Sequence, residues 1–269
     1  MSECWICSTC GVQYEASEAP PPRCFICEDE RQYVGLAGQS WTTPVALRAE
    51  RRNVFVEEEV GLWSVRTEPL FGIGQRAYLI QTGEGNLLWD SISLVNEESV
   101  ARVRELGGVR AIAVSHPHYY SAMADWSAAF GDVPVYVHED DRQWVAQPCA
   151  GLRFWSGETM ELFGGVRLVR SGGHFAGYQV ALWPDGANGA GALFAGDQPQ
   201  VCLDKRWVTF MYSYPNWIPL NGTQVKRITA SLEGLVFDRL YGAFGRNIVH
   251  GAKDVIARSE ERYLRAIAG

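Results

Sequence analysis

Two pairs of closely spaced cysteines near the N-terminus place the strongest constraint on how this chain can fold. Cys7 and Cys10 form one CxxC pair, and Cys24 and Cys27 form a second pair after a gap of thirteen residues. Two such turns can present four thiolates tetrahedrally to one ion, a geometry that suits zinc or a single iron. So short a segment cannot bury a self-sufficient core, so the metal must supply much of its folding free energy. We therefore predict a four-Cys metal-binding module at residues 1–39.

The composition bounds what the rest of the chain can be. The 269 residues are 47% hydrophobic and 20% charged, a balance that excludes a disordered or collagen-like chain. No apolar run reaches the length of a membrane helix, and a net charge of −7 argues against broad binding to nucleic acid. The first residues lack a secretory signal, and clustered CxxC pairs are typical of thiols kept reduced. We expect a cytoplasmic protein that contacts neither membrane nor nucleic acid; the oligomeric state stays open.

Strand-like and helix-like segments alternate beyond residue 39, and the region 40–269 is predicted to be one α/β domain. Asn96 has the position of an N-cap, and the pair Gly107 and Gly108 ends the helix that follows it. The predicted strands are 62–67, 77–82, 86–89, 110–115, 133–137, 165–170, 178–183 and 192–195. The predicted helices are 97–106, 122–130, 139–146, 223–235 and 253–268.

Chemically reactive side chains follow several of these strands. His116 and His118 form an HxH pair directly after an apolar strand, so both imidazoles can chelate one ion. His174 follows another strand within a glycine-rich turn, and glycine lets the backbone turn tightly beneath a metal. Asp197 ends an apolar strand in a Gly-Asp pair, and His250 precedes the last helix.

In this order and spacing, these motifs resemble the metallo-β-lactamase superfamily, whose members include glyoxalase II. The resemblance spans roughly residues 55–269 and implies an αββα sandwich with a metal site at one edge. Carried over residue by residue, it makes His116, His118 and His174 ligands of one metal, with Asp197 in reach.

The resemblance also shows what this chain lacks. The family's HxHxDH motif falls on His116, His118, Tyr120 and Ser121, so its aspartate and its last histidine are missing. A neutral serine hydroxyl is a poor zinc ligand, and tyrosine ligates only as a phenolate. We therefore predict one metal ion here rather than two.

Three further residues are assigned by the same comparison. His250 is interpreted either as a ligand or substrate contact or as a surface histidine. Ser121 is a candidate substrate or metal contact. Asp90 matches a strand-end aspartate that stabilises loops near the site, so we expect a structural role.

The cysteine pattern carries a second resemblance. Residues 7–14, with Cys7, Cys10, Gly11 and Tyr14, are similar to the CxxCGxxY knuckle of rubredoxin and of rubrerythrin modules. That resemblance implies iron and electron transfer. The acidic run 28–30 departs from the glycine usual in rubredoxins, and we favour a structural zinc.

The sequence is compatible with three functions. The first is a hydrolase of an ester, thioester, lactone or amide of a small molecule, in which Asp197 handles the proton and Tyr119 or Tyr120 stabilises an oxyanion. The second is a mononuclear iron oxygenase similar to persulfide dioxygenase, with His116, His174 and Asp197 as ligands. The third is a metal-stabilised binding protein without catalytic activity. We expect one zinc in each site, with iron as the alternative in either.

Overall fold

The computed structural model describes residues 2–268. Residue 1 of the first predicted domain and residue 269 of the second therefore lie outside the described residues. The chain divides into two compact units. The first comprises Met1–Val137 and Arg142–Phe154, and the second comprises His138–Asp141 and Trp155–Gly269. The predicted domain boundary at residue 39 stays a prediction.

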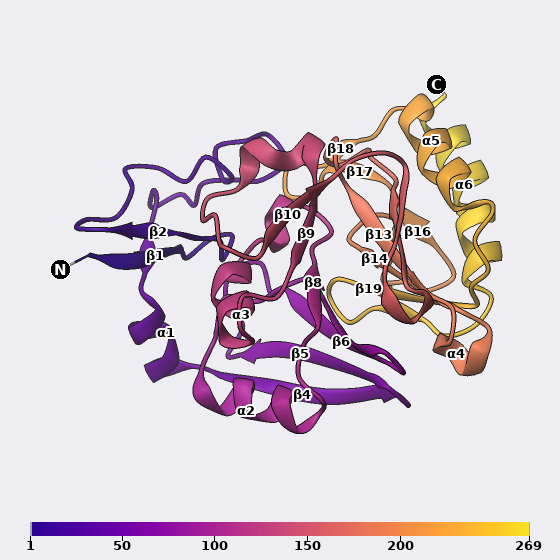
Figure 1. Ribbon diagram of the computed structural model, residues 1–269. Helices are drawn as coiled ribbons and strands as arrows, with labels where there is room; N and C mark the ends of the chain where they lie inside the picture. The colour runs from indigo at the N-terminus through magenta and orange to yellow at the C-terminus, as the bar shows by residue number, and fades with distance from the viewer. Residues whose placement is uncertain (1, 269) are drawn as a thin grey trace. The chain divides into compact units, whose positions relative to one another are not determined.

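The first unit begins with a small sheet beside the cysteine pairs. Strand β1 (Glu3–Cys7) pairs antiparallel with β2 (Gln13–Ser17) and with β3 (Trp41–Thr42). Figure 1 shows the β1–β2 hairpin close to the N-terminus. The ring of Tyr14 packs edge-on against Trp41, with 5.1 Å between the ring centroids. This apolar cluster around the cysteines is small, as expected for a module that depends on a metal.

A seven-stranded sheet in the order β10-β9-β8-β7-β6-β5-β4 carries the larger part of the first unit (Figure 1). Strands β4 to β7 are antiparallel neighbours, whereas β7, β8 and β9 run parallel. Parallel strands end at the same edge, so the segments after β7 and β8 emerge together. The strands are β4 (Arg52–Glu59), β5 (Leu62–Glu68), β6 (Arg76–Thr82), β7 (Gly85–Trp89), β8 (Ala111–Ala113), β9 (Val135–His138) and β10 (Leu152–Trp155).

Short helices connect these strands. Helix α2 (Glu97–Glu105) starts at Asn96, whose side chain accepts a hydrogen bond from the Ser99 amide at 3.0 Å. Two glutamates in its first turn complement the positive end of the helix dipole. The other helices of this unit are α1 (Pro44–Glu50) and α3 (Met123–Ala129).

The second unit is built on a six-stranded sheet in the order β11-β12-β13-β14-β19-β20. Its central strands are apolar and wholly buried, and β14 pairs parallel with β19. Helices α5 (Gly222–Leu232) and α6 (Ala252–Ile267) lie side by side (Figure 1). The sheet consists of β11 (Thr159–Glu161), β12 (Arg167–Arg170), β13 (Gln179–Trp183), β14 (Ala192–Gly196), β19 (Arg239–Gly242) and β20 (Asn247–Ile248). Two small hairpins pair β15 (Gln200–Val201) with β16 (Val208–Thr209), and β17 (Met211–Ser213) with β18 (Ile218–Pro219).

The predicted mixed α/β arrangement is confirmed, with each predicted strand present. The predicted helix at 139–146 is instead a 3₁₀ helix at Glu139–Trp144. The His138 ring accepts a hydrogen bond from the Asp140 amide at 3.2 Å, so a side chain caps the first turn. One short helical turn, α4 (Gly186–Gly189), lies between β13 and β14. Within residues 2–268, no helix combines the length and apolar character needed to cross a membrane.

Candidate metal centres

The four cysteines come together as predicted. Their sulfur atoms all lie within 4.8 Å of one another, and all four residues are buried. The Cys7 and Cys27 sulfurs are 3.6 Å apart, and the Cys10 and Cys24 sulfurs are 3.7 Å apart. Disulfide sulfurs lie at about 2.05 Å, whereas four sulfurs at ~2.3 Å from a tetrahedral zinc are about 3.8 Å apart. The geometry therefore fits a single tetrahedral ion.

Hydrogen bonds stabilise the thiolate form of these cysteines, whereas burial makes an uncompensated thiolate charge costly. The Gln39 side chain donates to the Cys7 sulfur and the Tyr14 hydroxyl to the Cys24 sulfur, both at 3.2 Å. Hydrogen bonds from the neighbouring thiols lower the pKa of Cys7, whereas burial raises the pKa of Cys10. Because a metal ligand must be a thiolate, a bound cation would compensate for the burial of these charges. Cys4 is outside this group.

The HxH pair lies in the loop that follows β8. The first histidine, His116, is oriented by a chain of hydrogen-bonding contacts that begins at Asp90. The Asp90 carboxylate accepts a hydrogen bond from the Ser115 amide at 2.7 Å, and the Ser115 hydroxyl lies 2.9 Å from His116 Nδ1. A partner on Nδ1 fixes the tautomer that leaves Nε2 as the ligand atom. Asp90 thus has the loop-stabilising contact predicted for it.

The rest of this loop is short and buried. A 3₁₀ helix at Pro117–Tyr119 contains His118, whose ring lies 5.0 Å from that of His116 between centroids. Tyr119 is buried against the His116 ring, with 5.2 Å between centroids, and Tyr120 is 2% exposed. Ser121 is also buried, has a φ of 35° and keeps its hydroxyl without a hydrogen-bond partner among the described residues. The loop therefore brings polar and aromatic side chains together beside two imidazoles.

His174 lies in the second unit, in the turn between β12 and β13. Its ring is fully buried and packs against Phe175 and Tyr178. Gly173 before it has a φ of +91°, and a Cβ there would lie 2.1 Å from the Gln198 side chain. A residue other than glycine would clash, so the glycine-rich turn is required for this close approach.

Asp197 follows β14, where a register shift between Phe194 and Gly196 interrupts pairing with β19. Its amide donates to the Tyr178 hydroxyl at 2.8 Å, and that hydroxyl lies 2.7 Å from Ala195 O and 3.2 Å from Asp197 Oδ1. The Tyr214 hydroxyl donates to the Asp197 carbonyl. Tyr178 thus contacts both the amide and the carboxylate of Asp197, whereas Tyr214 binds its main-chain carbonyl. Neither role could be predicted from the sequence.

Burial and the Asp197 charge raise the pKa of Tyr214 well above its usual value. Its phenol therefore stays protonated at neutral pH and remains a donor. The Tyr214 ring also packs 5.9 Å from the His174 ring between centroids. Tyr214 thus connects the two candidate ligands of the second unit.

The remaining histidines are placed differently. His250 lies at the surface with a 77% exposed side chain, and its Nδ1 is 3.0 Å from the Asp238 carboxylate. It is not part of the buried donor groups. His138 is buried, and its Nε2 lies 3.1 Å from the Gly157 carbonyl. Burial lowers the pKa of His138, as expected for a neutral structural imidazole.

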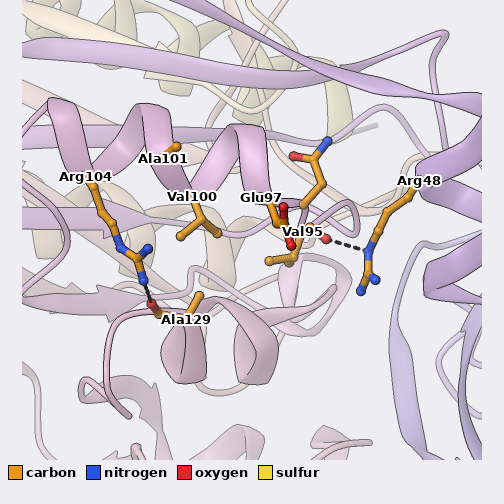
Figure 2. Close-up of a pocket in the computed structure, with 8 residues that line it drawn as sticks. Arg48, Val95, Glu97, Val100, Ala101, Arg104 and Ala129 are labelled. Atoms are coloured by element: carbon orange, nitrogen blue, oxygen red, sulfur yellow. Dashed lines mark hydrogen bonds between the residues drawn. The ribbon is translucent and has the colours of Figure 1, made fainter.

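A surface groove of 710 Å³ opens in the first unit, away from every predicted site residue of that unit. Figure 2 shows Arg48 and Arg104 at its two ends. Each donates to a backbone carbonyl, that of Val95 at 2.9 Å and that of Ala129 at 3.0 Å. Because both arginines donate to backbone carbonyls and no residue of the two candidate metal groups lines the groove, we assign it no function.

Comparison with solved structures defines the class of fold. VMB-1 matches with a TM-score of 0.61 and 13% identity over 81% of this chain and 99% of that chain. The metallo-β-lactamase DIM-1 gives 0.58 and 13% over 77% and 98%. The mono-zinc form of the metallo-β-lactamase FIM-1 from Pseudomonas aeruginosa gives 0.54 and 14% over 78% and 95%. The chain therefore has the metallo-β-lactamase fold, as its strand-end motifs predicted.

Sequence comparison then gives the family. No protein-family model matches the chain. The protein YmaE of Bacillus subtilis (strain 168) is 46% identical over 265 residues, which cover 98% of this chain and 96% of YmaE. The chain belongs to the same family as YmaE.

Proposed function

We propose that the chain is a metal-dependent hydrolase of a small-molecule ester, thioester, lactone or amide. The observation that carries the proposal is the presence of buried metal-ligand side chains in each unit, two imidazoles in the first and one imidazole and one carboxylate in the second. His116, His118, His174 and Asp197 are each at most 2% exposed. Buried polar groups of this kind are costly unless they are hydrogen-bonded or coordinate a metal. Imidazole and carboxylate are ligands that zinc and iron both accept.

A divalent ion held by these residues would supply Lewis acidity, lowering the pKa of a water molecule to ~7 and polarising a carbonyl. The chain's own residues would do the rest. Asp197, held by Tyr178, would orient a water molecule and accept its proton. Tyr119 or Tyr120 would donate a hydrogen bond to a developing oxyanion, and the buried Ser121 hydroxyl would contact the substrate.

The donor set supports one metal ion rather than two. Tyr120 and Ser121 stand where the family's second-metal ligands would be, and His250 pairs with Asp238 at the surface. Of the second-metal ligands carried over from the family, only Asp197 would remain. The solved FIM-1 structure is a mono-zinc form of this fold, so the fold accommodates a single zinc.

Metal analysis combined with a substrate panel tests this proposal. We expect two metal ions per chain, one in the four-Cys module and one at the histidines, together with hydrolysis of an ester, thioester, lactone or amide. His116→Ala should remove one ion and lower the hydrolysis rate by about 10³-fold, because several kcal/mol of transition-state stabilisation are lost.

His250→Ala is the matched control, since it removes a surface histidine and should leave both ions bound. A His116→Ala variant that retains both ions would refute the ligand assignment. Iron at the histidines, together with oxygen consumption and no hydrolysis, would favour the oxygenase hypothesis. A loaded protein inactive with every substrate would favour the binding-protein hypothesis.

A further inference from the structure

We propose that the four-Cys module holds the loop 115–121 in its ligand-presenting conformation, and that Gln75 is the positioning residue that couples them. The inference rests on the proposed metal site at the histidines, but not on the reaction carried out there. All the residues involved belong to the first compact unit. The four-Cys module thus supports the conformation of the loop that carries His116 and His118.

Gln75 makes the central contact. It lies in the turn before β6 and is 5% exposed. Its side-chain nitrogen donates to the Cys10 carbonyl and, at 3.0 Å, to the His118 carbonyl. A carboxamide nitrogen has two protons, so one side chain satisfies both acceptors. Each acceptor belongs to a candidate metal ligand, one from each centre.

Two further hydrogen bonds tie the same segments together. The main-chain amide of Gln13 donates to the Ser121 carbonyl at 3.0 Å, and the Ser93 hydroxyl donates to the Gly11 carbonyl at 2.6 Å. Gly11 has a φ of +80°, and a Cβ there would lie 2.7 Å from the Ser93 hydroxyl oxygen. The cysteine knuckle is therefore packed closely against the body of the unit.

These contacts matter because the histidine loop has little support of its own. Its regular structure is one 3₁₀ turn, and Ser121 after it has a left-handed φ of 35°. Residues that orient metal ligands typically change metal affinity by about 10- to 100-fold. Since the module needs its metal to fold, losing that metal should release the contacts to His118 and Ser121. The coupling must be reciprocal for binding free energies.

Cobalt titration of the full-length protein tests the coupling. With the four-Cys site loaded, Gln75→Leu and Gln75→Glu should weaken Co²⁺ binding at the histidines by about 10-fold. The charge-transfer bands of the cobalt–thiolate site should stay unchanged. Gln81→Leu is the matched control, because the Gln81 side chain also donates to a backbone carbonyl, that of Leu106 at 2.6 Å, at the far end of β6.

A second arm asks whether the coupling passes through Gln75. Cys24→Ser should weaken cobalt binding at the histidines by about 10-fold in the wild-type background, and much less when Gln75→Leu is already present. Equal effects in both backgrounds, or affinities within about twofold of wild type for all Gln75 variants, would overturn the inference. If the leucine and glutamate variants do not fold, hydrogen exchange of residues 115–121 in the wild-type protein replaces them. That exchange should speed up when the four-Cys metal is removed.

This design separates the two proposals. Failure of the wild-type histidines to bind cobalt at all would refute the metal site and the inference with it. Cobalt binding that is indifferent to Gln75 and to the cysteines would refute the inference alone. Hydrolysis is not measured, so the identity of the substrate does not affect the result.

Discussion

The four-Cys cluster and the histidine and aspartate donors are two ways of building a metal site. The cysteines come from two turns within twenty-one residues, in a segment with little apolar core. The histidines and Asp197 follow strands of large sheets and are oriented by neighbouring polar groups. The first arrangement needs its ion in order to fold, whereas the second exists because the sheets fold without it.

The two sites are supported by different parts of the molecule. Around the cysteines, Gln39 and Tyr14 donate to two of the sulfurs and Gln75 donates to the Cys10 carbonyl, but the ion itself must hold the four thiolates together. Each of three other donors has a hydrogen-bonding neighbour that orients it. Ser115 contacts His116, Tyr178 contacts Asp197, and Gln75 contacts the His118 carbonyl. Mutation of a ligand should therefore unfold the first site, and mutation of a supporting residue should loosen the second.

Cys7→Ser should change the protein most. We expect it to remove the four-Cys ion and to lower the free energy of unfolding of residues 3–42 by more than about 4 kcal/mol, because loss of a structural metal is among the most destabilising changes. Hydrogen exchange of β1 and β2 and the metal content per chain measure it.

Cys4→Ser is the control for this change, since Cys4 lies outside the cluster and has the Gln147 side chain 3.7 Å from its sulfur. When metal is in excess, the histidine site should still bind an ion in both variants. Slow exchange in β1 and β2 of Cys7→Ser would show that the module folds without its ion, and the comparison would fail.

Tyr178→Phe should have a smaller effect. Without the hydroxyl, Asp197 loses a hydrogen-bond donor to its carboxylate and an acceptor for its amide. We expect metal affinity at the histidines to fall by about 10- to 100-fold, with the four-Cys ion retained. Competition with a chelator of known affinity measures the change.

Tyr263→Phe provides the matched control in the same unit. The Tyr263 hydroxyl also lies near backbone carbonyls, with Leu220 O at 3.2 Å, but it has no contact with Asp197. If both variants lost the same affinity, Tyr178 would have no particular role in holding the carboxylate.

Local patterns in the sequence explain which parts of this molecule could be predicted. The cysteine pairs and the apolar strands before His116 and Asp197 are contiguous signals, and the structure contains both features. Strand β4 was missed because it reads RNVFVEEE and is an edge strand whose residues are at most half-buried. Without a buried face, an edge strand has no alternating pattern to detect.

The supporting residues could not be predicted for a different reason. In the sequence, Tyr178 is one more aromatic residue at the start of a predicted strand, and Gln75 is a polar residue next to a glycine before another. Their roles depend on carbonyls and carboxylates that are distant in sequence; Gln75 and its acceptor His118 are 43 positions apart. Such contacts exist only once the sheets have formed.

Asp238→Asn should have the smallest effect, and it asks whether burial is what separates a metal site from a surface ion pair. Hydrogen bonds from the Gly251 amide at 2.7 Å and then from His250 lower the pKa of Asp238. A lowered pKa means that the carboxylate stabilises the folded chain above its unfolded value of about 3.9, and that this contribution disappears as the pH falls through the folded value.

Because the pair is largely exposed, we expect Asp238→Asn to lower the free energy of unfolding by less than about 1 kcal/mol near pH 7. The difference from wild type should shrink as the pH is lowered toward the pKa of the carboxylate, and urea unfolding across this range measures it. The metal content should stay at two ions per chain. Loss of an ion in Asp238→Asn would instead make His250 part of the metal site, and a histidine beside a carboxylate would then suffice without burial.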